Sequence, residues 1–142
     1  MLLQKHRSKK KMNKSERKRL TKRLDDLCRD IIRFQWSNRC AYCHKYIEGS
    51  NSHPHHIIHK GNGASWRRFD LINIILLCHH HHQWWHNNPI ESRPWFVKKF
   101  PGRLDYLSKY QGGKPAKIST QEMRDLVEQY KKKLQEWKET EQ

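Results

Sequence analysis

Apolar residues recur at helical spacing near both ends of the chain. From Leu20 they return at i+4, i+7, i+8, i+11 and i+12, which puts one apolar stripe on a helix expected over about residues 15–35. Ser119 and Glu122 stand in capping-box spacing before a second stripe, which continues to Trp137. Both ends of the chain are therefore predicted to form amphipathic helices.

The middle of the chain carries shorter patterns. Two short segments, 54–58 and 73–77, are predicted as the strands of a hairpin with a long loop. A helix is expected from residue 78 to about 87, where an Asn-Pro pair ends it. Proline at a helix start predicts another helix over 94–100, and the glycine-containing stretch 111–115 is expected to be a linker. The whole pattern predicts an α+β fold with a small hairpin-and-helix core between N-terminal and C-terminal helices.

Charge narrows the class of partner. The 142 residues include 30 Lys and Arg against 14 Asp and Glu, a net charge of +16, with only 35% apolar residues. Eleven of the basic residues lie between positions 5 and 23 beside a single acid, Glu16. This balance favours nucleic acid as the partner. We expect contacts to the DNA backbone, without base readout, from Arg67, Arg68, Lys9, Lys10, Lys11, Arg17 and Lys18.

No segment predicts membrane insertion or export. The longest apolar run, 71–77, is interrupted by Asn73 and is far shorter than the roughly 20 residues of a membrane span. The first residues hold no apolar stretch of signal-peptide length. We therefore expect a cytoplasmic protein whose four cysteines are reduced and available to bind metal.

Two short pairs of candidate ligands predict a structural zinc site. A C-x2-C pair and a C-x2-H pair, separated by 34 intervening residues, supply four soft donors, as a tetrahedral zinc ion requires. The expected ligands are Cys40, Cys43, Cys78 and His81. His79 and His80 are the alternatives to His81, and small core residues are the alternative interpretation of these cysteines. Cys28 lies on the first apolar stripe and is expected to be an ordinary core residue.

A second polar set lies among these pairs and just beyond them. It consists of His55, His56, Asn73, His82 and His86. His82 and His86 are i and i+4 on one predicted helix, so their rings share a face and can bind one ion together. The alternative interpretations are a non-catalytic zinc finger and adventitious metal binding by a histidine-rich run.

The order of this set resembles the HNH, or ββα-metal, nuclease family. The His-His pair at 55–56 precedes Asn73, and the stretch 73–82 resembles the family pattern N-[apolar]4-C-x2-C-H with one histidine in place of cysteine. The His82-x3-His86 spacing resembles the colicin-type DNase variant. The resemblance implies an HNH core with structural zinc over 38–90. Charge and periodicity predict a basic disordered arm at 1–14, a basic amphipathic helix at 15–37 and a C-terminal helical extension at 91–142.

The same resemblance implies a role for each residue. His55, His82 and His86 would bind a catalytic divalent metal, His56 would be left free as general base to activate water, and Asn73 would brace the loop that carries it. An all-histidine set suits Zn²⁺, Ni²⁺ or Mn²⁺ better than Mg²⁺, which prefers oxygen donors. The implied reaction is phosphodiester hydrolysis with 5′-phosphate and 3′-hydroxyl products. Residues whose roles stay open are His59, His79 and His80.

A looser resemblance, over about residues 20–137, is to the phage NinG, or Rap, recombination endonucleases. It rests on the basic helix before the zinc knuckle, the Arg68-Phe69-Asp70-x2-Asn73 stretch and the capped C-terminal helix. It implies branched recombination intermediates as the DNA substrate. Two other functions stay open: a non-catalytic zinc module that binds nucleic acid, and a sequence-specific homing or restriction nuclease. The C-terminal stripe would either pair two subunits as a homodimer or pack onto the first helix.

Overall fold

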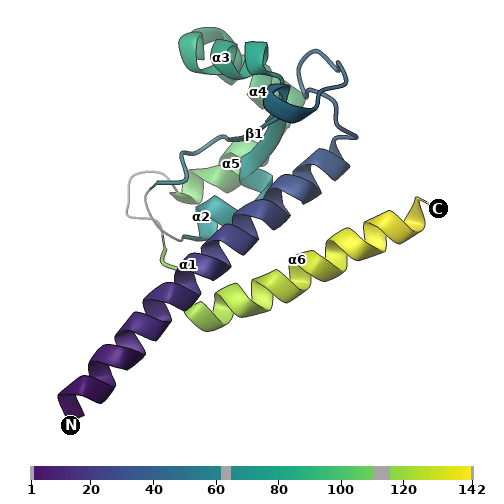
Figure 1. Ribbon diagram of the computed structural model, residues 1–142. Helices are drawn as coiled ribbons and strands as arrows, with labels where there is room; N and C mark the ends of the chain where they lie inside the picture. The colour runs from purple at the N-terminus through teal and green to yellow at the C-terminus, as the bar shows by residue number, and fades with distance from the viewer. Residues whose placement is uncertain (1, 62–64, 111–115, 142) are drawn as a thin grey trace. The chain divides into compact units, whose positions relative to one another are not determined.

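The computed structural model describes residues 2–61, 65–110 and 116–141, and side-chain surroundings from residue 13 onward. It divides the chain into two compact units, one of Met1–Ile31 with Lys117–Gln142 and one of Ile32–Ala116. The expected C-terminal extension is therefore shared between the two units. Together the elements confirm the α+β class, mostly helical with a small sheet (Figure 1).

Two long helices build the first unit. Helix α1 spans Leu2–Gln35, and α6 spans Thr120–Thr140. Helix α1 begins well before residue 15, so the segment expected to be disordered has a helical backbone. The reason lies in its composition, since residues 2–14 contain no Gly or Pro and are rich in helix-forming Lys, Arg and Leu. The side chains of Lys9, Lys10 and Lys11 lie outside the described part of the chain.

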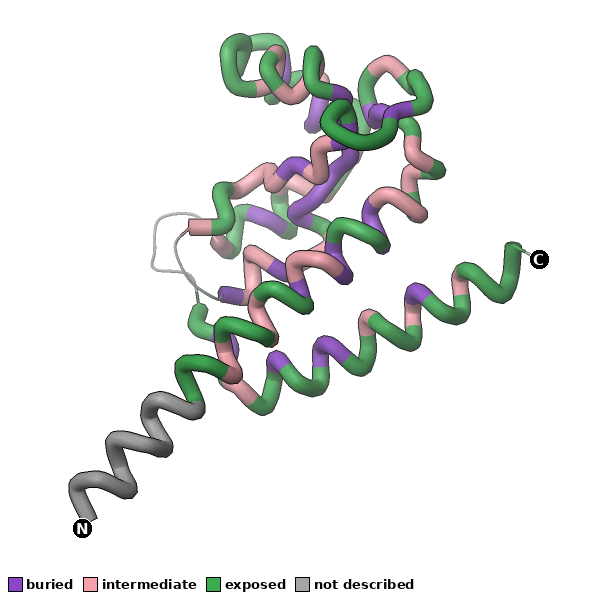
Figure 2. Tube along the Cα trace, viewed as in Figure 1, coloured by how far each residue is buried: buried purple, intermediate pink, exposed green. Residues whose placement is uncertain are grey.

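The apolar stripes predicted for these helices are buried. Figure 2 shows buried positions recurring along α6, and these are Met123, Leu126, Val127 and Leu134. On α1 the buried residues of the same unit are Leu24, Leu27, Cys28 and Ile31, as the 3.6-residue period predicts. Burial within one chain accounts for the C-terminal stripe without a second subunit. The homodimer stays a prediction.

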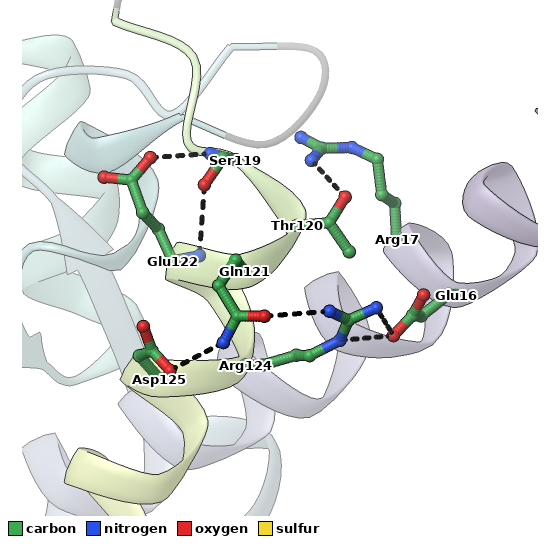
Figure 3. A network of polar contacts seen from close by, with 8 residues as sticks. All are labelled: Glu16, Arg17, Ser119, Thr120, Gln121, Glu122, Arg124 and Asp125. Carbon is green, nitrogen blue, oxygen red and sulfur yellow. Dashed lines mark hydrogen bonds and ion pairs between the residues drawn. The ribbon is translucent and has the colours of Figure 1, made fainter.

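Polar contacts join the two helices of the first unit near the start of α6 (Figure 3). Arg17 donates from Nη1 to Thr120 Oγ1 at 3.0 Å and from Nη2 to the Ile118 carbonyl at 2.8 Å. Arg124 forms an ion pair with Glu16 at 2.6 Å. The guanidinium of Arg17, expected to contact DNA, is thus engaged by the start of α6.

The predicted capping box is present at the same helix end. Ser119 Oγ accepts from the Glu122 amide, and Glu122 Oε1 accepts from the Ser119 amide, both at 3.1 Å. These hydrogen bonds satisfy two backbone N–H groups that a helix start leaves without partners. The start of α6 is therefore fixed by the two residues that the sequence indicated.

The second unit contains the predicted hairpin. Strand β1, His53–His56, pairs antiparallel with β2, Ile74–Leu77, and places His55 opposite Ile75. The loop between them holds the short helix α2, Trp66–Phe69, and a 3-10 turn, Leu71–Asn73. All four residues of β2 are buried, which explains their continuous apolar run.

Three helices and two 3-10 turns complete this unit. Helix α3, His79–Asn87, follows β2 with Cys78 as N-cap, close to the predicted bounds. Helix α4 spans Pro89–Lys99, so the expected start at Pro94 is wrong: Pro89 takes the favourable first position, and Pro94 lies inside the helix. The remaining elements are α5 at Arg103–Leu107 and the 3-10 turns Gly49–Asn51 and Ser108–Tyr110.

The short helix α5 carries no periodic signal, and tertiary contacts hold it in place. Gly102 precedes it with φ +79°, a left-handed conformation that glycine adopts without strain. Tyr106 and Tyr110 both donate their hydroxyls to Asp70 Oδ2 at 2.7 Å. These bonds tie the segment to the loop that leads into β2.

Among the described residues, no helix is both long and apolar enough to cross a bilayer.

Candidate metal centres

The four residues predicted to bind structural zinc lie together. The knuckle at 40–43 and the start of α3 bring their ligand atoms within 4.8 Å of one another. The Cys43 and Cys78 sulfurs are 4.0 Å apart, and Cys40 Sγ is 3.9 Å from His81 Nδ1. Tetrahedral ligands with zinc–sulfur bonds of about 2.3 Å would lie about 3.8 Å apart. A zinc ion therefore fits this cluster.

Local backbone geometry prepares both pairs of ligands. The amide of His44 donates to the Cys40 carbonyl at 2.9 Å, and the Tyr42 amide donates to Cys40 Sγ at 3.4 Å. On α3 the His81 amide donates to Cys78 Sγ, also at 3.4 Å. The two bonds to sulfur stabilise thiolates, so the knuckle and the helix start each present a sulfur suited to a cation.

The pKa values of the cysteines also favour a cation here. Burial raises the pKa of Cys40, but hydrogen bonds from the backbone of Cys43, Cys78 and Tyr42 outweigh burial and hold it below its usual value. Burial, together with the negative charges of Cys40 and Cys43, raises the pKa of Cys78 to about 11. Several thiolates in one place thus repel one another, and a bound zinc ion would remove that repulsion.

Three histidines form a second cluster in the same unit. His55 comes from β1, while His82 and His86 lie one turn apart on α3, and their ligand nitrogens all lie within 4.8 Å of one another. The Nε2 atoms of His82 and His86 are 3.3 Å apart. Two nitrogens bound tetrahedrally at about 2.0–2.1 Å from one zinc ion would be separated by about 3.3–3.4 Å. The cluster has the spacing of a metal site.

Protonation in this cluster also suits metal binding. His55 is only 4% exposed, and its Nε2 is buried without a hydrogen-bond partner among the described residues. Burial, with smaller contributions from the neighbouring His82 and His86, lowers the pKa of His55 to about 3. Burial, with His53 and His86, lowers the pKa of His82 to about 4. Both rings are therefore neutral at pH 7, the form that binds metal.

His53 belongs to the same surroundings, and sequence reasoning missed it. Its ring stacks on His82 with centroids 4.9 Å apart and planes at 19°, and its Nε2 is buried without a described partner. The sequence could have indicated His53, because residues two apart on a strand share a face and His53 lies two positions before His55. Trp85 covers His55 from α3 at 5.0 Å between centroids.

Asn73 makes the loop contacts that its predicted role requires. Its side chain is fully buried. Its Nδ2 donates to the carbonyls of Ile58 and Arg67, both at 2.9 Å, and its Oδ1 accepts from the Ile58 amide at 2.8 Å. One side chain therefore joins the two ends of the loop between β1 and β2.

His56 is the last residue of β1 and directly follows His55. Its Nε2 donates to the Arg68 carbonyl at 2.9 Å. The loop between the strands folds back over β1 to make this contact, and the role of general base stays a prediction.

The other candidate residues lie outside both clusters. Arg67 is half-buried with Nε buried and without a described partner, and the Arg68 guanidinium lies 6.0 Å from the Phe69 ring centroid. Lys18 is exposed on α1. His59 is exposed and accepts a hydrogen bond from its own loop. Exposed histidines at the start of α3, not grouped with either cluster, are His79 and His80.

Comparisons with known protein families, with curated proteins and with solved structures found no match. The fold and the site geometry define an α+β protein whose second unit holds two clusters of side chains suited to metal ions.

Proposed function

We propose that the chain is a metal-dependent endonuclease of the HNH type, which hydrolyses phosphodiester bonds in DNA. The observation that supports this most is the convergence of His55, His82 and His86 from a strand and a helix. The order strand, strand, helix and the loop contacts of Asn73 agree with the same proposal. A net charge of +16 favours a polyanionic substrate.

The clusters divide the chemical work. The three histidines would hold a divalent cation, which when bound supplies stabilisation of negative charge on the phosphate and on the departing 3′ oxygen. His56, which directly follows His55 on β1, would take a proton from the attacking water as general base. The water oxygen would bond to phosphorus as the bond to the 3′ oxygen breaks. The departing 3′ oxygen would take a proton from solvent, which leaves 5′-phosphate and 3′-hydroxyl ends.

The zinc ligands would fix α3 rather than react. Cys78 caps this helix and His81 lies in its first turn, so zinc binding there would hold His82 and His86 against β1. Branched recombination intermediates are the DNA substrate we propose, on the resemblance to the phage recombination endonucleases. Backbone contacts from exposed basic residues such as Lys18 would supply affinity that falls steeply with salt.

A non-catalytic, zinc-dependent nucleic-acid-binding module is the second candidate. The cysteine-containing cluster and the basic charge favour it, because neither feature requires cleavage. A sequence-specific nuclease of the homing or restriction type is a variant of the first candidate. The three proposals differ in whether DNA is cut and in where it is cut.

A nicking assay tests the proposal. Purified protein is incubated with supercoiled plasmid or a synthetic four-way junction in Mg²⁺, Mn²⁺, Ni²⁺, Zn²⁺ or EDTA. We expect metal-dependent nicking that is lost in His86→Ala and falls about 10²- to 10⁴-fold in His56→Ala, the usual contribution of a general base. His80→Ala is the matched control, since His80 is exposed on the same helix outside the cluster. Binding without cutting in every metal would favour the binding module, and discrete fragments would indicate sequence specificity.

A further inference from the structure

A cavity of about 230 Å³ opens beside the histidine cluster, and His86 forms part of its wall. One water molecule occupies about 30 Å³ in the liquid, so the cavity has room for about eight waters or one flat heterocycle. Most of the remaining wall is apolar or aromatic, from Ile57, Ile58, Trp85, Phe96 and Leu104. A metal-binding cluster and an apolar cavity therefore share one residue.

The walls of this cavity are held in place before any ligand binds. Asn73 fixes one wall, since its backbone carbonyl accepts from the Ile57 amide at 2.8 Å and its side chain binds both backbone groups of Ile58. Another part of the wall is an aromatic pair, Trp85 and Phe96, with ring centroids 5.7 Å apart and planes at 86°. A preformed cavity loses little free energy in ordering its walls when a ligand enters.

Charge at the cavity selects the kind of ligand. Arg93 lines it from α4 and is exposed, and none of the described residues that line it is acidic. Apolar walls suit a flat ring, while a guanidinium at the rim suits an anion attached to that ring. Bases of unpaired nucleotides stack on aromatic side chains, with arginine contacts to their phosphates, in nucleic-acid-binding proteins. A nucleotide offers both groups in one molecule.

We propose that this cavity takes one unpaired nucleobase of a nucleic acid strand, with Arg93 on its phosphate, next to the bond that the histidine cluster cleaves. The inference rests on the proposed nuclease function and specifies its substrate. A base inside a duplex is stacked and paired and cannot enter, so the substrate has an unpaired nucleotide at the cleavage position. Branch points, bulges and single strands meet this condition.

Binding to two matched duplexes tests the inference. One carries a single extrahelical adenine and the other an extrahelical abasic residue in the same position, with phosphorothioate linkages on both sides to slow cleavage. Backbone, charge and bulge are then alike, and only the base differs. Fluorescence anisotropy with the zinc-loaded protein should give about five- to 150-fold tighter binding of the adenine duplex, the range for one stacked base. Equal affinity for the two duplexes would overturn the inference.

Variants locate the effect within the structure. Leu104→Trp fills the cavity from α5 and should abolish the preference for adenine, whereas Leu104→Ala leaves it open and should keep the preference. A folded Leu104→Trp protein that still prefers adenine would contradict the inference. Arg93→Glu should weaken binding of both duplexes more than Lys98→Glu, an equal change of charge at an exposed position of α4 outside the cavity. Equal losses of affinity in the two variants would show that Arg93 does not contact the bound nucleotide.

These measurements fail separately from the nicking assay. If the protein prefers the adenine duplex but nicks no DNA in any metal, the base-binding cavity is supported and the nuclease proposal is wrong. If it nicks plasmid in a metal-dependent way but binds both duplexes equally, the nuclease proposal is supported and the cavity does not bind a base.

Discussion

Replacing Asn73 with alanine should lower the free energy of unfolding by about 3–5 kcal/mol. The side chain is fully buried and makes three hydrogen bonds of 2.8–2.9 Å, with both backbone groups of Ile58 and with the Arg67 carbonyl. A net hydrogen bond contributes about 1 kcal/mol, and a buried group left unpaired costs about 1–3 kcal/mol. Three backbone groups left without partners would cost at least about 3 kcal/mol of unfolding free energy. Because these groups are part-buried, water can reach them in the variant, which keeps the expected loss at or below about 5 kcal/mol.

Chemical denaturation of the zinc-loaded protein measures this loss. Asn88→Ala is the control, because Asn88 is exposed and its side chain makes one 3.3 Å bond to the Trp84 carbonyl; we expect it to cost less than about 1 kcal/mol. Asn73→Asp has nearly the same shape but loses both donors and points a carboxylate at two carbonyls, so it should destabilise at least as much as alanine. A loss below about 1 kcal/mol for Asn73→Ala, or a wild-type-like aspartate variant, would refute the argument.

Three further predictions concern the zinc cluster, pH and the first unit. Cys78→Ala should reduce bound zinc, measured by elemental analysis, whereas Cys28→Ala, also at a buried cysteine, should keep it. The free energy of unfolding, measured across a pH series, should fall as the pH is lowered from about 6.5 toward 3. His55 and His82 have pKa values of about 3 and 4 in the folded protein, so over this range the unfolded chain binds more protons than the folded one. A free energy of unfolding that does not change with pH would contradict this. Arg17→Ala removes two part-buried hydrogen bonds and should cost about 1–2 kcal/mol in thermal or chemical denaturation, and no measurable loss would disprove their contribution.

Patterns that depend on neighbours along the chain were predictable. Ligand spacing within Cys40–Cys43 and within Cys78–His81 is a property of one knuckle and one helix turn, and the structure brings the two pairs together as expected. The i, i+4 pair on α3 is equally local, since the helix period alone puts its two rings on one face. The capping box of α6 needs only Ser119 and the residue three positions on.

Features that join distant parts of the chain needed the tertiary structure. The stacking of His53 on His82, the hydrogen bond from His56 to Arg68 and the placement of α5 through Asp70 all depend on how loops fold back over the hairpin. A loop carries no hydrophobic period that would fix its path, so its partners cannot be inferred from spacing.

The sequence by itself determined the helices near both ends of the chain, the hairpin, the helix that follows it and the candidate metal ligands, because backbone periodicity and ligand spacing are short-range. Only the tertiary structure decided which histidines meet and that a cavity lies beside His86. Those outcomes depend on packing between residues far apart in the chain, where shape and burial rather than local propensity set the free energy.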